Sequence, residues 1–492
     1  MAAAIGGLNV ERECRVNLEH LASLGLAVAR PSLSPVKARA APAGVQPQVM
    51  TEPAAHARPT RTIPIQSAPP RPAAPAPGRA PWRPSMLLVA PHRLGFFLAM
   101  AVLAAASGWW VLVQASRVGG APALDHVVPP TVTHAVVMVF GFMPLFFSGF
   151  LFTAGPKWLD VRPYGARQLL PPLGLQAAGW LPWLAGAHLG RGMALAGLLL
   201  SCAGLGWMFG LFWRLVLASR EPDRVHALAV GCGGVVGTAS LAGAGLALAA
   251  GQDALALVFA RTGLWGCIVV TYVAVAHRMI PFFTSSAVPM VQVWRPFWVL
   301  WLMLGVAAFE VLAAWVDFAA PGPRAWPAWM LLCIAVEAAA GGVLLWLAVA
   351  WGLVQSLRIR LLAMLHVGFV WLGVALLLSA LSQALWLATG RAVLGLGALH
   401  ALSMGFLGSI MVAMVTRVSC GHSGRALVAD NLVWALFWGL QVSVGVRLAA
   451  AVEGAPAWWT AAAALLWAVV VTAWALRCAR WYGRPRVDGK PG

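Results

Sequence analysis

Blocks of about 20 apolar residues recur along the chain from residue 94 onward. A helix of this length crosses a hydrocarbon layer about 30 Å thick, and lipid offers peptide groups no hydrogen-bond partner outside the helix itself. Of the 492 residues, 61% are hydrophobic and 10% are charged, whereas soluble domains carry about 25% charged residues. These proportions exclude a water-soluble enzyme and predict an all-α polytopic membrane bundle.

We expect about twelve membrane-spanning helices in a domain that extends over 86–482. Their predicted limits are 94–115, 131–153, 169–187, 192–217, 226–249, 254–276, 297–316, 326–352, 361–387, 393–416, 431–450 and 457–476. An even number of spans places both ends of the domain on one side of the membrane. A short basic C-terminal tail follows at 483–492.

Residues 1–85 differ in composition from the rest of the chain. From Pro31 to Pro84 the sequence is rich in Pro, Ala and Arg and lacks helical or alternating apolar periodicity, which is typical of disordered segments. The sequence therefore predicts one of two things. The segment is either a disordered cytoplasmic tail or, if the true start is Met50 or Met86, a segment included by a misassigned start.

The formal net charge of +19 suggests nucleic-acid binding until the basic residues are located. If the chain begins in the cytoplasm, eighteen of the 24 Lys and Arg residues after residue 85 fall on the inner side of the membrane. This is the bias of the positive-inside rule. We therefore expect cytoplasmic termini, membrane lipid as a partner and no nucleic-acid partner. The six on the outer side are Arg117, Arg191, Arg261, Arg324, Arg391 and Arg447.

Two histidines begin the same short sequence, H-A-x-x-M, on the second and the tenth predicted spans. His134 and His400 each lie one helical turn from a methionine on the same helix face, and both helices run inward from the outer side. Imidazole inside a bilayer needs a partner, and it is the commonest protein ligand of haem iron and copper. The two residues either ligate a metal or cap backbone and hydroxyl groups within the bundle.

A second group of histidines is expected at the cytoplasmic side. His226 begins the fifth span, His277 ends the sixth, and His366 lies early in the ninth. Pro281 follows His277 and removes a helix hydrogen bond, so we expect the sixth span to break there. These residues are candidate metal ligands, and the alternative is that they are ordinary interfacial helix ends.

Cys420 and His422 form a C-x-H pair in the predicted loop S-C-G-H-S-G-R. Thiolate and imidazole together suit copper, although such pairs are also common in loops that bind nothing. The seven cysteines contain no C-x-x-C, so neither a zinc knuckle nor a disulfide framework is indicated.

Four charged residues in or near the spans are further candidates. Glu337 lies near the middle of the eighth span, where a carboxyl group is expected to be protonated or paired. It is either a proton carrier to a redox site or a structural hydrogen-bonding group. Glu310 is expected to reach the outer interface. Arg278 and Arg417 lie at inner helix ends and could bind haem propionates, although topology alone accounts for them.

Four longer segments carry a resemblance to a known family. They are A-P-H-R-L-G-F-F-L at 90–98, T-H-A-V-V-M-V-F-G-F-M-P-L-F-F-S-G-F-L-F-T-A-G-P-K-W-L at 133–159, A-H-R-M-I-P-F-F-T at 276–284 and H-A-L-S-M-G-F-L-G-S-I-M-V-A-M-V-T-R-V-S-C-G-H-S-G-R at 400–425. In these segments the chain resembles the NnrS family of bacterial membrane proteins, and the likeness extends over nearly everything after residue 85.

The resemblance implies a haem- and copper-containing protein of the bacterial cytoplasmic (inner) membrane. It also implies a role in nitric oxide metabolism, denitrification or resistance to nitrosative stress, with nitric oxide as the small-molecule ligand. The leading metal-binding residues would then be His134, His277 and His400, with His92, His226, His366 and His422 behind them. Which histidine holds which metal does not follow from the motifs.

Three functions remain open from the sequence. The first is a haem- and copper-binding protein that handles nitric oxide, in which case it could be an oxidoreductase with an unidentified electron donor. The second is a transporter or permease, for example of a metal, with the same histidines along its path; clear duplication of one half in the other, which would favour it, is not apparent. The third is a sensor or assembly factor that binds haem without turnover.

Overall fold

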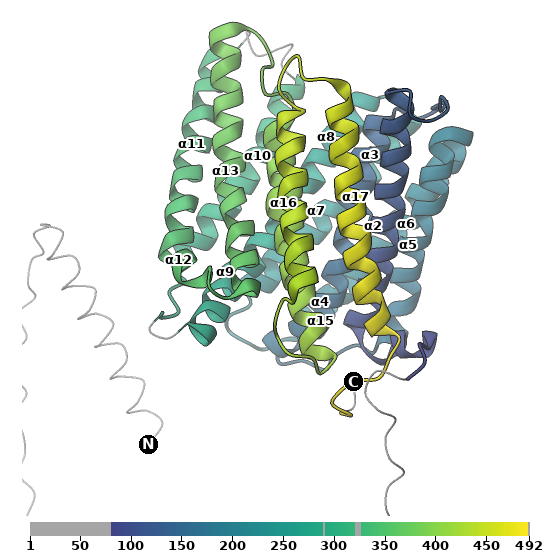
Figure 1. The fold of residues 1–492 in the computed structure, drawn as a ribbon, viewed down its shortest axis with the longest axis vertical. Coiled ribbons are helices and arrows are strands. Elements are labelled where there is room, and N and C mark those ends of the chain that lie inside the picture. The colour runs from purple at the N-terminus through teal and green to yellow at the C-terminus, as the bar shows by residue number, and fades with distance from the viewer. Residues whose placement is uncertain (1–79, 289–290, 320–325, 491–492) are drawn as a thin grey trace, which may run out of the picture. The chain divides into compact units, whose positions relative to one another are not determined.

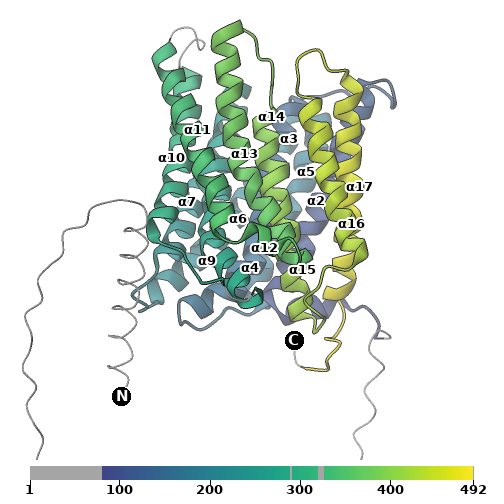
Figure 2. The same ribbon diagram turned by 60° about the vertical axis from the view of Figure 1, so that its left-hand side comes forward.

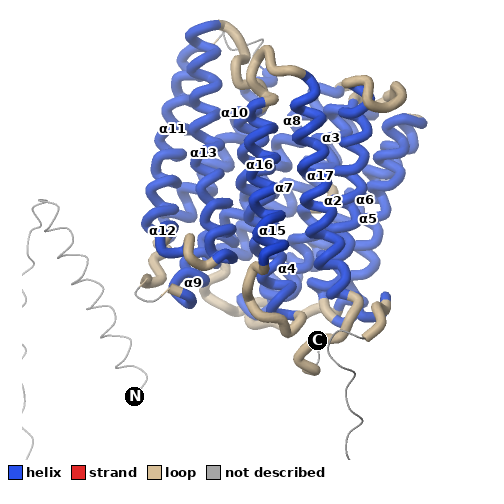
Figure 3. The backbone as a smooth tube through the Cα atoms, viewed as in Figure 1, coloured by secondary structure: helices blue, strands red, loops and turns tan. Residues whose placement is uncertain are grey.

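The computed structural model describes residues 80–288, 291–319 and 326–490. Within these ranges every regular element is a helix and no strand occurs, as Figure 3 shows. This confirms the predicted all-α bundle of a multi-pass membrane protein. Nearly all of the predicted tail at 1–85, including the possible start at Met50, lies outside the described residues.

The helices follow the order of the predicted apolar blocks (Figure 1). The first half contains η1 (Pro84–Val89), a 3-10 helix, and the α-helices α2 (Pro91–Arg117), α3 (Pro130–Phe140), α4 (Met143–Trp158), α5 (Ala166–Leu189), α6 (Arg191–Ala218) and α7 (Val225–Ala249). The second half contains α8 (Asp253–Gly263), the π-helical η2 (Leu264–Val269), α9 (Val270–Ala287), α10 (Phe297–Ala319), α11 (Pro327–Ala350), α12 (Leu353–Ser356), α13 (Arg360–Thr389), α14 (Gly397–His400), the π-helical η4 (Ala401–Gly408), α15 (Ser409–His422), α16 (Asn431–Ala449) and α17 (Ala457–Tyr482).

The two ends of the described bundle meet. The backbone N–H of Arg83 donates to the carbonyl oxygen of Gly483 at 2.8 Å, and the indole N–H of Trp82 donates to the carbonyl oxygen of Ala479 at 3.1 Å. Residues that lie before the first span and after the last span therefore share one end of the bundle. We call this the basal end and the opposite end the distal end.

Ends that meet require an even number of crossings. Eleven helical segments among the described residues are long and apolar enough to span a membrane. The expected span at 169–187 is the helix α5, which packs along α6 but carries three internal prolines that lower its apolar content. Because eleven crossings would separate the two ends, α5 must cross as well, which agrees with the predicted twelve.

Three spans depart from regular α-helix in their interior. The second divides at 141–142 between α3 and α4, the sixth contains η2, and the tenth contains η4. Their apolar windows are 78%, 61% and 72% buried, against 28–56% for the other spans apart from α13 at 67%. The irregular spans therefore form the centre of the bundle, and π-helical turns within α-helices occur frequently at functional sites.

The position of the irregularity in the sixth span differs from our expectation. We expected a break at Pro281, beside His277. Instead α9 continues through Pro281 to Ala287, and the irregular turn lies earlier, at η2. A proline inside a helix removes only one hydrogen bond and need not end the helix where neighbouring helices pack against it.

Close contact between two helices positions the first histidine. A Cβ atom on Gly95 of α2 would lie 2.6 Å from Ser148 Oγ and 2.7 Å from the backbone nitrogen of Gly149, both on α4. Glycine at these positions lets the two backbones touch. This contact holds His92, one turn before Phe96 on α2, against α4 near the basal end.

Other helices form the flanks of the bundle. In Figure 2, α10 and α11 lie at one side and α16 and α17 at the other. The helices α11 and α13 pack along each other. The predicted tail at 483–492 is described up to residue 490 and folds back onto the bundle, where the backbone N–H of Val487 donates to the carbonyl oxygen of Ser423 at 3.0 Å.

Candidate functional site

Eight of the nine histidines in the described part of the chain lie in pairs, each formed by segments distant in sequence. The pairs are His92 with His422, His226 with His277, His126 with His188 and His134 with His400. The first two pairs lie at the basal end and the other two at the distal end. Among the described residues no third His, Cys, Asp or Glu joins a pair to form a three-ligand metal group.

The basal pair of His226 and His277 has a defined direction of hydrogen bonding. The Nε2 atom of His277 lies 3.1 Å from the carbonyl oxygen of Pro296, which can only accept, so this nitrogen carries the hydrogen. The Nδ1 atom of a neutral His277 then accepts from His226 Nε2, 3.0 Å away. The buried His226 Nδ1 keeps its lone pair and has no hydrogen-bond partner within the described chain. Metal-binding imidazoles are commonly backed by a carbonyl in this way.

His366 is the ninth histidine and lies on α13 at the basal end. Its Nε2 atom is 2.9 Å from the hydroxyl oxygen of Thr284, and that hydroxyl donates to the carbonyl oxygen of Ile280 at 2.9 Å. The hydroxyl hydrogen is therefore in use, and His366 Nε2–H donates to Thr284. The Nδ1 atom of His366 is buried and unpartnered among the residues that the structure describes, which leaves it open to a ligand.

The other basal pair joins α2 to α15. The ring centroids of His92 and His422 are 4.3 Å apart. Basic side chains adjoin the pair: Arg93 donates to the carbonyl oxygens of Tyr482 and Arg484 at 3.1 and 2.8 Å. The C-terminal segment thus helps to enclose this pair.

Cys420 does not share a site with His422. We expected both in a loop, but they lie in the last turn of α15. Residues two apart on a helix point to different sides, and Cys420 lies near Cys478 of α17 while His422 faces His92. The helical geometry therefore separates the two members of the predicted C-x-H copper site.

The distal pair of His134 and His400 lies beneath a tryptophan. The ring of His134 stacks on Trp110 at a centroid distance of 3.9 Å, and its Nδ1 atom is buried without a partner among the described residues. His400 Nδ1 lies 2.9 Å from the carbonyl oxygen of Leu396 and must donate to it, so Nε2 keeps a lone pair. The two imidazoles are close enough for their charges to interact.

Arg447 lies near both of these histidines and was missed by the sequence analysis as a site residue. Its Nη1 atom is buried and has no hydrogen-bond partner within the described ranges. A buried guanidinium nitrogen without a partner suits an anionic ligand group. The available signal was its position as one of only six basic residues on the expected outer side, where basic residues are disfavoured.

The remaining distal pair is held by neighbouring groups. The Trp109 indole donates to His188 Nε2 at 2.8 Å, so His188 Nδ1 carries the hydrogen and donates to the carbonyl oxygen of Asp125 at 2.8 Å. Both ring nitrogens of His188 are thus in use. Burial, His188 and Arg117 together hold the pKa of His126, in the loop between α2 and α3, below its usual value.

A family model described as NnrS protein matches residues 86–486. The chain belongs to the NnrS family. The match covers all four histidine pairs and His366, and the family is linked to nitric oxide. None of the curated proteins compared with the chain matches it.

In this NnrS chain the two predicted propionate-binding arginines lie far from the distal pair. The guanidinium carbon of Arg278 is 5.0 Å from the centroid of the Trp158 ring, and that of Arg417 is 3.9 Å from the centroid of Phe283. Seventeen residues of helix separate His400 from Arg417, which is about 25 Å along the axis. The structure therefore does not bring these arginines to a cofactor held by His134 and His400.

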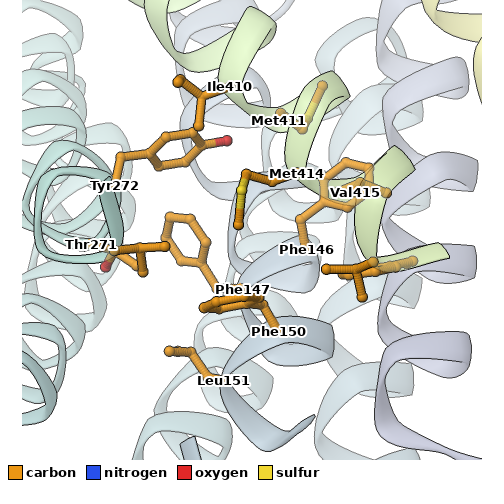
Figure 4. A pocket seen from close by; sticks show the side chains of 13 residues that line it. Phe146, Phe147, Phe150, Leu151, Thr271, Tyr272, Ile410, Met411, Met414 and Val415 are labelled. Atoms are coloured by element: carbon orange, nitrogen blue, oxygen red, sulfur yellow. The ribbon is translucent and has the colours of Figure 1, made fainter. Parts of the chain in front are cut away.

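An apolar cavity of about 60 Å³ lies among α4, α9 and α15. Phe96 of α2 lines it one helical turn from His92, and Val418 of α15 lines it one turn from His422. The cavity thus lies next to a basal histidine pair of the NnrS domain. Figure 4 labels the lining residues Phe146, Phe147, Phe150, Leu151, Thr271, Tyr272, Ile410, Met411, Met414 and Val415.

Glu337, the candidate proton carrier, lies on α11 away from the histidine pairs. The side-chain amide of Gln383 on α13 donates to both carboxyl oxygens, at 2.8 and 2.9 Å. Glu310 does not reach the interface as we expected; it is 5% exposed because its face of α10 turns toward α11 and Glu337. The sequence analysis missed this partnership.

Proposed function

We propose that this NnrS protein binds copper and haem within the membrane and acts on nitric oxide. The observation that carries the proposal is the set of buried imidazole nitrogens that keep a lone pair beside a second histidine. Nitrogens of this kind are what a bound metal requires. We propose nitric oxide as the ligand because the family is linked to nitric oxide.

Copper is the metal that fits the basal pair of His226 and His277. Copper(I) accepts few ligands and binds imidazole well, so the free Nδ1 atom of His226 could hold it while His277 orients the His226 ring. The carbonyl of Pro296, 3.1 Å from His277, orients that ring. A bound copper ion would supply a centre that binds nitric oxide and changes oxidation state.

We assign haem to the distal pair of His134 and His400. The ring centroids of the other three pairs are 4.3, 4.7 and 5.2 Å apart, which leaves no room for a macrocycle between them. His134 and His400 each keep a nitrogen available, and Arg447 supplies a buried cationic group for a propionate. Arg447 thus takes the role that we had expected of Arg278 and Arg417.

Nitric oxide is expected to occupy the apolar cavity beside the basal end. The gas is small and uncharged, and the lining residues, apart from the hydroxyl groups of Thr271 and Tyr272, offer it apolar walls. A volume of about 60 Å³ admits a diatomic gas but is far below the 300–1,000 Å³ of pockets for drug-sized ligands. The cavity is therefore assigned to the gas and not to haem.

The proposed location is the bacterial cytoplasmic membrane with the basal end in the cytoplasm. The eighteen basic residues of the positive-inside pattern belong to the basal half of the bundle. An electron donor, which remains to be identified, would approach from this side. The physiological role is then nitric oxide metabolism or resistance to nitrosative stress, beside denitrification.

Metal analysis with optical and EPR spectra of purified protein, before and after nitric oxide, tests the proposal. We expect a haem Soret band that is lost in His400→Ala, and copper that is lost in His226→Ala, because His226 Nδ1 is the free nitrogen of the basal pair. His188→Ala is the matched control, because both nitrogens of His188 are hydrogen-bonded and neither is open to a metal. Well-folded protein without haem and without copper contradicts the proposal.

A metal transporter is the second candidate. It is favoured by histidine pairs at both ends of one bundle and by the irregular turns in three central spans, features that a path across the membrane would use. Proteoliposomes distinguish the two functions. Uptake of copper that depends on His226 and His134 favours transport, whereas tightly bound metal without uptake favours the first proposal.

A further inference from the structure

Two carboxyl groups from neighbouring helices face each other inside the bundle. Glu310 of α10 is 5% exposed and Glu337 of α11 is 2% exposed. Their side chains lie within hydrogen-bond distance of each other. This pair lies on the α10, α11 and α13 flank of the bundle (Figure 2), away from the histidine pairs.

The hydrogen bonds around the pair are incomplete. Gln383 donates to both oxygens of Glu337 at 2.8 and 2.9 Å, and the hydroxyl of Ser379 also binds it. Glu310 lies beside Glu337, and its buried Oε1 atom has no hydrogen-bond partner among the described residues. Two carboxylates cannot hydrogen-bond to each other, because neither has a hydrogen to donate. The missing group is a proton.

The surrounding charges do not replace that proton. Arg261 of α8 is the only cation recorded near Glu310 within the described chain, Asp317 of α10 adds a negative charge, and Cys333 of α11 adjoins Glu337. Two negative charges side by side in apolar surroundings repel strongly. With Glu310, Glu337 and Asp317 all ionised, three negative charges would face one cation, so a proton held by the Glu310–Glu337 pair reduces the repulsion.

Helices α11 and α13 pack closely on the basal side of the pair, and a cavity lies further along the same two helices toward the distal end. One turn basal of Glu337, a Cβ atom on Gly341 would lie 3.0 Å from the carbonyl oxygen of Gly373, so α11 and α13 are in backbone contact there. Toward the distal end a cavity of about 350 Å³ is lined by Met330 of α11 and Trp386 of α13. Trp386 lies one turn from Gln383.

We propose that Glu310 and Glu337 form a proton-binding site that exchanges one proton with the distal side of the membrane. The O–H bond of the protonated carboxyl group breaks, its electron pair stays on the carboxyl oxygen, and the proton passes to water in the distal cavity; both carboxyl groups are then ionised, with Arg261 as the nearby cation. The site does not depend on bound metal, so it can be tested independently of the function proposed above.

Infrared spectroscopy of the purified full-length protein in lipid tests the proposal. We expect a carboxylic-acid C=O band near neutral pH that shifts in D₂O and is lost in the Glu310→Gln/Glu337→Gln double variant. Glu453→Gln is the matched control, because Glu453 is a distal carboxylate that pairs with Arg391 at 2.8 Å on the surface. A band that is absent from the wild type, or that the double variant retains, overturns the proposal.

Two further measurements keep the proposal testable if the double variant does not fold. Dicyclohexylcarbodiimide reacts with protonated carboxyl groups in apolar surroundings, so mass spectrometry of the wild type should find label on Glu310 or Glu337 and none on Glu453. Label on neither buried residue overturns the proposal. Met330→Phe, which narrows the distal cavity, should slow the D₂O shift of the band; an unchanged rate overturns the distal route.

Discussion

His226 donates a hydrogen bond to His277 across 3.0 Å, between helices α7 and α9, and the carbonyl of Pro296 fixes the direction of that bond. This series of hydrogen bonds ends at the carbonyl oxygen of Pro296, which can only accept. At the other end of the series, Nδ1 of His226 therefore keeps a free lone pair. This relationship makes the pair a candidate metal site, whereas two interfacial histidines in isolation would be unremarkable as helix ends.

Replacement of His277 by alanine removes the acceptor for His226 and leaves the Pro296 carbonyl without its donor. If copper binds there, its affinity should fall by at least the roughly 10–100-fold that loss of an orienting partner costs. Competition with a copper(I) chelator measures the change. His188→Ala should bind copper as the wild type does, and equal affinities in all three proteins would contradict the prediction.

The contact between α2 and α4 should not tolerate even a methyl group. Gly95→Ala places a Cβ 2.6 Å from Ser148 Oγ, so we expect a loss of about 1–3 kcal/mol in the free energy of unfolding. Gly108→Ala on the same helix meets nothing within 4 Å and should be neutral or stabilise by up to about 1 kcal/mol. Denaturation in detergent measures both, and equal effects would show that the close contact does not exist.

Arg447→Gln should weaken haem binding without unfolding the bundle, because it removes the buried cation beside His134 and His400. The Soret absorbance per protein after haem titration measures the loss. Arg391→Gln serves as the control, since Arg391 forms an exposed ion pair at the same end of the bundle and such pairs contribute at most about 1 kcal/mol. Haem retention by Arg447→Gln equal to that of the control would remove Arg447 from the proposed site.

The loop that contains His126 should loosen in mild acid. Burial, His188 and Arg117 lower the pKa of His126 in the folded protein, so the unfolded loop binds a proton at a higher pH than the folded one does. Stability is therefore full above the ordinary histidine pKa of about 6.5 and declines as the pH falls below it. Hydrogen–deuterium exchange of residues 119–129, compared at about pH 7.5 and about pH 5.5, should reveal faster opening at the lower pH. His126→Gln should abolish that difference.

The number and order of the helices could be predicted because each membrane-spanning helix corresponds to one continuous apolar block of the sequence. The helix α5 shows the limit of this signal: its prolines reduce the apolar content, and the meeting of Arg83 with Gly483 is what requires it to cross. The break at Pro281 was predicted wrongly. Local propensity favours an interruption there, but packing in the centre of the bundle keeps α9 helical.

The histidine pairs could not be predicted, because pairing depends on which helices lie side by side. His92 and His422 are 330 positions apart, and no local pattern connects them. The same holds for Glu310: we expected its side chain at the interface, but in the structure it lies beside Glu337 of α11. The sequence did indicate which residues form the sites. Burying an imidazole or carboxyl group in a bilayer costs free energy, so such residues are candidate site residues even when their partners cannot be predicted.

The meeting of the first and last helices has a consequence for biosynthesis. His92 enters the membrane with the first span, but its enclosure by Tyr482, Arg484 and Arg486 requires the end of the chain. Ribosomes make the N-terminal half first, so this pocket stays unfinished until translation is nearly complete. A polypeptide cut before α17 would still insert its earlier spans, but it would lack the groups that enclose His92 and His422.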